Sequence, residues 1–89
     1  MDALLRVLTQ QQEEMVKTLR RLVEAESPST DKAAVDRLGE FVGGIAQEMG
    51  ARVRFYPSRQ TGNHLWAEFR LDSRRPSGQI LLLGHLDTV

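Results

Sequence analysis

Residues 31–56 have the sequence DKAAVDRLGEFVGGIAQEMGARVRFY, and the spacing of their apolar side chains changes at Gly50. Before Gly50 the apolar residues recur every three or four positions, which is the repeat of one helical face. They are Val35, Leu38, Phe41, Val42, Ile45 and Met49. After Gly50, Val53 and Phe55 alternate with two arginines and a tyrosine, as in a strand with one exposed face. The stretch therefore predicts a helix followed by a strand.

Both ends of this predicted helix have residues that favour a helix boundary. The capping candidates at its start are Ser29, Thr30 and Asp31. Gly50 can adopt the left-handed conformation that commonly follows the last helical residue. Gly43 and Gly44, inside the helix, each cost about 1 kcal/mol relative to Ala. They indicate either that another backbone packs closely there or that the two glycines are simply tolerated.

The N-terminal part of the chain predicts a second helix, ahead of the first. From about Asp2 to Ala25 the apolar residues fall mostly three, four or seven positions apart, which indicates one long amphipathic helix. Gln11 and Gln12 interrupt the apolar stripe, so the first two turns could project beyond the core. The helix must end before Pro28, because proline disfavours the helical conformation of the preceding residue. Residues 27–31 are therefore expected to form a turn.

Two more strands are predicted after residues 52–56. Residues 64–71 alternate between apolar and polar side chains, as in a half-buried strand. Residues 80–83 are apolar without alternation, as in a central strand that is covered on both faces. The loops SRQTGN and DSRRPSG precede these two strands. The order predicts an α/β layered domain, with two helices followed by three strands of a mixed sheet, and a second covering layer that these residues do not supply.

Composition excludes several classes of function. The 12 basic and 12 acidic side chains give a net charge of zero, so no long-range field draws the chain to nucleic acid or an anionic membrane. Cysteine is absent, so a metal site would use His, Asp and Glu ligands. The first 15 residues lack the uninterrupted apolar core of a secretory signal or a membrane span, and we expect a cytoplasmic protein.

His85 and Asp87 follow the apolar run at residues 80–83, and ligand sites in open α/β sheets lie beyond the carboxyl ends of strands. In an extended segment residues i and i+2 point to the same side, so the two side chains can hydrogen-bond. A zinc-ligating histidine normally donates its other ring N–H to a carboxylate. The pair therefore predicts a metal ligand, His85, with Asp87 as its partner. The motif is short, and a histidine after an apolar run is more often exposed to solvent.

Other candidate residues have simpler interpretations. His64 starts the strand at residues 64–71 and is a second possible ligand, but we interpret it as structural or solvent-facing. Six arginines raise the question of a nucleic-acid surface, yet several alternate with apolar residues and the acidic residues balance them. We place them on the exposed strand face and in the loops. They are Arg52, Arg54, Arg59, Arg70, Arg74 and Arg75.

From about Glu14 onward the chain resembles the zinc aminoacylase and glutamate carboxypeptidase family, which includes acetylornithine deacetylase and succinyl-diaminopimelate desuccinylase. The specific part is GHLDTV, within LLLGHLDTV at residues 81–89. The helix ending LVEAESPS and the segment TGNHLWAEF support the resemblance, in the same order along the chain.

The resemblance implies that His85 matches the family's first zinc-ligand histidine and that Asp87 matches the catalytic-site aspartate that orients it. It implies that residues 1–89 are the N-terminal portion of a layered catalytic domain. The intact protein would be a two-zinc metallopeptidase or deacylase that hydrolyses amide bonds of N-acyl amino acids or small peptides, and a homodimer. The family's other ligands, general-base Glu and lid domain have no counterpart in residues 1–89. The fragment by itself is expected to be inactive.

Two alternative functions share features with this sequence. The metallo-β-lactamase type also has a histidine and aspartate cluster after an apolar strand, but it needs a second histidine that residues 84–89 lack. The other alternative is a truncated, non-catalytic module that binds a partner through residues 80–83 and the long first helix. A large uncovered apolar patch would be expected of such a module, and equally of a severed enzyme.

Overall fold

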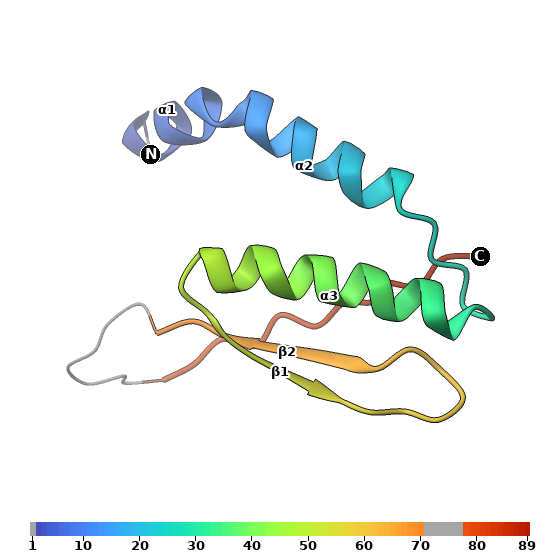
Figure 1. Cartoon of the computed structure of the whole chain (residues 1–89). Coiled ribbons are helices and arrows are strands. Elements are labelled where there is room, and N and C mark those ends of the chain that lie inside the picture. Colours follow the sequence, from blue (N-terminus) through green and yellow to red (C-terminus); the bar gives the residue numbers. More distant parts are fainter. Residues whose placement is uncertain (1, 71–77) are drawn as a thin grey trace.

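The computed structural model describes residues 2–70 and 78–89. Its helices are α1 (Asp2–Gln10), α2 (Gln12–Glu24) and α3 (Lys32–Glu48), and its strands are β1 (Arg52–Tyr56) and β2 (His64–Glu68). Figure 1 shows α3 lying along the two-stranded sheet, with α1 and α2 forming an N-terminal arm on the other side of α3. The predicted α/β character is confirmed, while the number of strands differs.

The N-terminal arm (residues 2–24) consists of two helices where the sequence predicts one. Gln11 separates them with φ −96° and ψ 2°, outside the helical region. Its N–H is shared between the carbonyls of Val7 at 3.2 Å and Leu8 at 3.1 Å, so the helical hydrogen bonding is distorted there but not lost. The break falls at the glutamines that interrupt the apolar stripe. No residue of α1 or α2 is buried.

Helix α3 begins and ends as its sequence predicts. Asp31 is its N-cap, because the Asp31 side chain accepts a hydrogen bond from Ala34 N at 3.1 Å. Gly50 follows the helix with φ 94°, the left-handed conformation that glycine adopts without steric cost. The buried residues of α3 lie on one face and form most of the core. They are Ala34, Val35, Leu38, Gly39, Gly43 and Ala46.

The antiparallel pairing of β1 and β2 sorts side chains onto two faces. Val53 is opposite Ala67, and Phe55 is opposite Leu65. These apolar residues face α3, because a Cβ on Gly43 would lie 2.9 Å from Phe55 Cζ, 3.3 Å from Val53 Cγ1 and 3.5 Å from Leu65 Cδ1. The predicted close packing at Gly43 is therefore present, but against side chains of the sheet instead of another backbone. The remaining pairs lie on the opposite face and are Arg52 with Glu68, Arg54 with Trp66 and Tyr56 with His64.

The prediction of three strands in a mixed sheet is wrong for the part of the chain that the structure describes, which holds one antiparallel pair. Residues 80–83 are not in a strand, and their side chains are 70% to 91% exposed. An apolar run forms a central strand only where neighbouring strands take its backbone hydrogen bonds and layers cover its faces. The described residues provide neither. Most of the predicted loop at 72–78, with Leu71, Arg74 and Arg75, lies outside the described residues.

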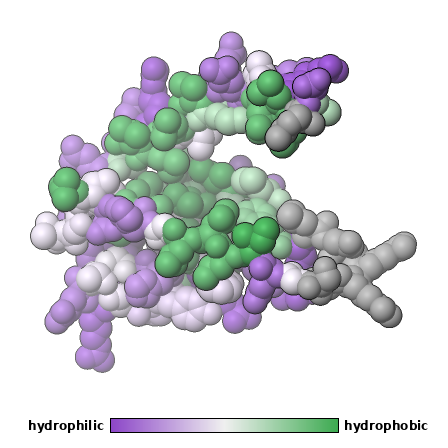
Figure 2. Space-filling view, turned by 180° about the vertical axis from the view of Figure 1, so that it is seen from behind, coloured by the Kyte–Doolittle hydropathy of each residue, from purple (hydrophilic) through white to green (hydrophobic). Residues whose placement is uncertain are grey.

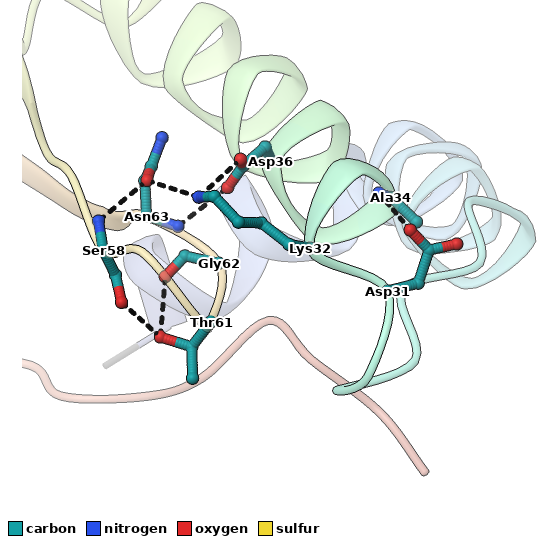
Figure 3. A network of polar contacts seen from close by, with 8 residues as sticks. All are labelled: Asp31, Lys32, Ala34, Asp36, Ser58, Thr61, Gly62 and Asn63. Carbon is teal, nitrogen blue, oxygen red and sulfur yellow. Dashed lines mark hydrogen bonds and ion pairs between the residues drawn. The ribbon is translucent and has the colours of Figure 1, made fainter.

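A polar network attaches the loop between β1 and β2 to the start of α3 (Figure 3). Asn63 Oδ1 accepts from Ser58 N at 3.0 Å and from Lys32 Nζ at 2.8 Å. Asp36 accepts from Asn63 N at 2.7 Å and from Lys32 Nζ at 2.9 Å. The hydrogen bond from the Asn63 backbone, with a smaller contribution from Lys32, lowers the pKa of Asp36. The network therefore favours the charged carboxylate.

Much apolar surface is left uncovered, as Figure 2 shows on both the N-terminal arm and the rest of the molecule. The arm touches α3 through the Arg21 guanidinium, which lies 4.6 Å from the centre of the Phe41 ring. An open groove lined in part by Leu38 and Phe41 lies between α2 and α3. The exposed apolar residues of the arm are Leu4, Leu5, Val7, Leu8, Met15, Val16, Leu19 and Val23. The arm and residues 80–83 thus present surfaces suited to further packing.

The two adjacent glycines of α3 allow a matched test of this packing. Gly44→Ala places its Cβ in open space, so it should stabilise the chain by up to about 1 kcal/mol through helix propensity. Gly43→Ala makes the same helical gain but overlaps Phe55 and Val53, and should be about 1–3 kcal/mol less stable than Gly44→Ala. Urea denaturation of both variants measures the difference. Equal stabilities would show that Gly43 does not pack closely on the sheet.

The lowered pKa of Asp36 predicts an acid-dependent loss of stability. The contribution of Asp36 is fully present above its unfolded pKa of about 3.9 and is lost as the pH falls through the lower folded value. Asp36→Asn should therefore be less stable than the wild type at neutral pH, with the difference shrinking below about pH 4. Thermal denaturation between neutral and acid pH measures it. Glu40→Gln, on the same helix and outside the network, is the control, and a pH-independent Asp36→Asn difference would contradict the prediction.

Candidate functional site

The end of the chain is held against the turn between α2 and α3. Thr88 N donates to Ser27 O at 2.7 Å, and Ser29 N donates to Thr88 O at 2.8 Å. These bonds form an isolated parallel bridge between Pro28 and Thr88. Pro28 fits the centre of the bridge because the bonds use the carbonyl before it and the N–H after it, so its missing N–H costs nothing. Figure 1 shows the C-terminus beside this turn.

Ser27 also binds the C-terminal segment, through its side chain. Its side chain is the most buried polar group among the described residues, at 1% exposure, and its hydroxyl donates to Leu86 O at 2.8 Å. Leu86 in turn reaches α3, where its Cδ1 lies 4.0 Å from the position that a Cβ on Gly39 would take. The segment around Leu86 is therefore anchored although residues 80–83 are exposed.

His85 and Asp87 form the hydrogen bond that their spacing predicts. The Nδ1 atom of His85 lies 3.2 Å from Asp87 Oδ1 and 2.9 Å from the Asp87 carbonyl oxygen. Both partners only accept hydrogen bonds, so in a neutral imidazole the ring proton is on Nδ1. The lone pair is then on Nε2. The His85 side chain is 83% exposed, and its hydrogen bonds in the described part of the chain all use Nδ1.

Ser29 is the second donor to the Asp87 carboxylate. Its hydroxyl lies 2.5 Å from Asp87 Oδ2 and 3.1 Å from Thr88 O. Each carboxylate oxygen of Asp87 therefore has its own donor, Ser29 on one side and His85 on the other. The Ser29 hydroxyl is the main cause that lowers the pKa of Asp87, with a smaller contribution from His85. Ser29, Asp87 and His85 thus form one connected polar chain.

Sequence reasoning found His85 and Asp87 but missed the contribution of the two serines. Ser29 is a capping candidate by its position, yet Asp31 takes that role in α3. Ser27 and Ser29 bond to residues 59 and 58 positions away, and no local pattern signals such contacts. His64 lies at the start of β2 opposite Tyr56, and no hydrogen bond in the described residues joins it to His85.

The arrangement fits one ligand of a zinc site. Imidazole nitrogen is a preferred zinc donor, and a ligating histidine typically has its other nitrogen bonded to a carboxylate or carbonyl, as His85 has. Within residues 2–70 and 78–89, no group of three or more His, Asp or Glu side chains is placed to hold a metal ion. One imidazole with one orienting carboxylate supplies part of a coordination sphere and leaves further ligands to be provided.

Comparisons of the chain with family models, with curated proteins and with solved structures give no match. The resemblance to the zinc hydrolase family therefore stays a prediction from residues. In the described part of the chain, none of the helices is both long enough and apolar enough to cross a membrane.

Removing the buried serine hydroxyl tests the anchoring of the site. Ser27→Ala leaves the Leu86 carbonyl without its donor, and should weaken the bridge by about 1 kcal/mol. Hydrogen exchange at the Thr88 amide, which bonds to Ser27 O, should become roughly fivefold faster. Ser58→Ala, which removes an exposed hydroxyl bonded to Thr61, is the control. Unchanged exchange at Thr88 in Ser27→Ala would contradict the anchoring role.

Proposed function

We propose that this chain is the N-terminal part of a zinc-dependent hydrolase that cleaves amide bonds of N-acyl amino acids or small peptides. One observation carries the proposal: Nδ1 of His85 is held by two acceptors of Asp87, so that in the neutral ring of this largely exposed side chain Nε2 bears the lone pair. This is the arrangement of a metal-ligating histidine with an orienting carboxylate. The sequence GHLDTV around it, which resembles the zinc aminoacylase and glutamate carboxypeptidase family, gives independent support.

Each residue has a defined role in the proposed enzyme. His85 would hold a zinc ion through Nε2, and Asp87 would keep the ring in the required tautomer and raise its basicity. Zinc, when bound, polarises a substrate carbonyl and makes a water molecule more acidic near neutral pH. The remaining ligands and the general base that removes the proton of that water would come from outside residues 1–89.

The uncovered apolar surface supports a longer protein. Residues 80–83 and the N-terminal arm expose large apolar side chains, which a complete layered domain would bury. We further propose that the intact protein acts as a homodimer on a small-molecule or peptide substrate, as a deacylase or as a carboxypeptidase-like metallopeptidase, with two zinc ions at each active site.

The same exposed apolar surface favours one second candidate, a non-catalytic module that binds a partner protein through residues 80–83 and the arm. The mass of the protein produced from its own gene in its native cell distinguishes the two. A mass several times that of the 89 residues supports the hydrolase. A mass equal to that of the 89 residues, with a monomeric and cooperatively folded chain, supports the module.

The hydrolase proposal predicts how zinc binding depends on two residues of the intact protein. His85→Ala should lose zinc at one site and nearly all amide hydrolysis, because a ligand is removed. Asp87→Ala should weaken zinc binding about 10–100-fold, because the ligand ring loses its orienting partner. Zinc content by mass spectrometry and hydrolysis of N-acyl amino acids measure these effects. His64→Ala removes an exposed imidazole on β2 and is the control, and normal zinc content in His85→Ala would overturn the assignment.

A further inference from the structure

We propose that Ser29 is a positioning residue that fixes the Asp87 carboxylate and, through it, holds the His85 ring with Nε2 as the available nitrogen. Only the identity of what Nε2 binds rests on the proposed function. The positioning itself is a property of the three side chains and of the turn at residues 27–29.

The first step is that His85 cannot orient Asp87 without help. The bond from His85 Nδ1 to Asp87 Oδ1 is 3.2 Å, which is long for an N–H donor, and the Asp87 side chain is 42% exposed to competing water. The terminal torsion of an aspartate has broad rotational preferences, so a single long bond leaves the carboxylate plane poorly defined. The short bond from Ser29 to Oδ2 supplies the second point that defines the plane.

The second step is that the turn carrying the Ser29 hydroxyl is bonded to the segment that carries Asp87. Ser29 N donates to Thr88 O at 2.8 Å, and the preceding residue is Pro28, whose φ is fixed by its ring. Ser27, one residue further back, is buried and bonded to Leu86. The turn that carries the donor is thus fixed to the segment that carries the acceptor, by bonds to the residues on both sides of Asp87.

The third step excludes two other roles for this hydroxyl, a helix cap and a nucleophile. Asp31 caps α3, so Ser29 is not needed as the cap. The order of contacts is Ser29 to Asp87 to His85, whereas a nucleophilic serine needs the histidine between it and the aspartate. No histidine nitrogen is placed to take the Ser29 proton among the described contacts. The geometry is that of a donor which orients a carboxylate.

The test uses nitrogen NMR of the intact protein in its metal-free form, which reports which ring nitrogen carries the proton. It is made at a pH where titration of the ring signals shows His85 to be neutral. The wild type should have predominantly Nδ1–H at His85. Ser29→Ala should lower the ratio of Nδ1–H to Nε2–H by up to about fivefold, because the Asp87 carboxylate is no longer fixed while the bond from Nδ1 to the Asp87 carbonyl oxygen remains. Ser29→Thr keeps the hydroxyl and should keep the wild-type ratio.

His64 gives an internal control in the same spectra, because its ring signals should be equal in all three proteins. An unchanged His85 ratio in Ser29→Ala, or an equal change in Ser29→Ala and Ser29→Thr, would overturn the proposal. In the intact protein, Ser29→Ala should also bind zinc about 10–100-fold more weakly than Ser29→Thr. If the tautomer ratio responds as expected and the intact protein holds no zinc, the positioning role stands and the hydrolase proposal fails alone.

Discussion

The parallel bridge between Pro28 and Thr88 is the contact on which the arrangement of the candidate site depends. Residues 80–83, just ahead of His85, are almost fully exposed and bond to no strand among the described residues. The two backbone bonds of the bridge, and the buried Ser27 hydroxyl below them, are what hold the following segment against the start of α3. They bring together groups that lie almost sixty positions apart. They also bring Ser29, the donor to Asp87 from outside its own segment among the described residues, within reach of the carboxylate.

The rest of the fold supports this contact with a small core, formed by one helix packed on two strands. Helix α3 buries one face on the apolar side of β1 and β2, and Gly43 allows Phe55 and Val53 to approach the helix. The Asp36 network then closes the loop between the strands onto the first turn of α3. Among the described residues, nothing covers the opposite face of the sheet or the N-terminal arm in this way, so the described core is small and the exposed apolar surface is large.

The chemistry proposed for this chain follows from the order of three side chains. Asp87 lies between Ser29 and His85, and each of its oxygens meets one of them. Two acceptors of Asp87 meet Nδ1 and determine the tautomer of the neutral ring, and the tautomer determines that Nε2 is the nitrogen able to bind a metal. The short motif His-x-Asp is by itself weak evidence for a metal ligand. An exposed imidazole bonded to a carboxylate that accepts hydrogen bonds from two donors is a more specific arrangement. The family resemblance and the geometry thus support the same role from different starting points.

The sequence by itself determined the features that depend on neighbours along the chain. The apolar repeat of α3, its cap at Asp31, its end at Gly50 and the alternation in β1 and β2 are local, because helix and strand periods and backbone conformation are set within a few residues. The pairing of His85 with Asp87 is local for the same reason. The tertiary structure alone decided that residues 80–83 form no strand and that Ser27 and Ser29 hold Asp87 and its segment. An apolar run has no period that reveals whether a strand partner exists, and a contact across 58 residues leaves no repeat in the sequence.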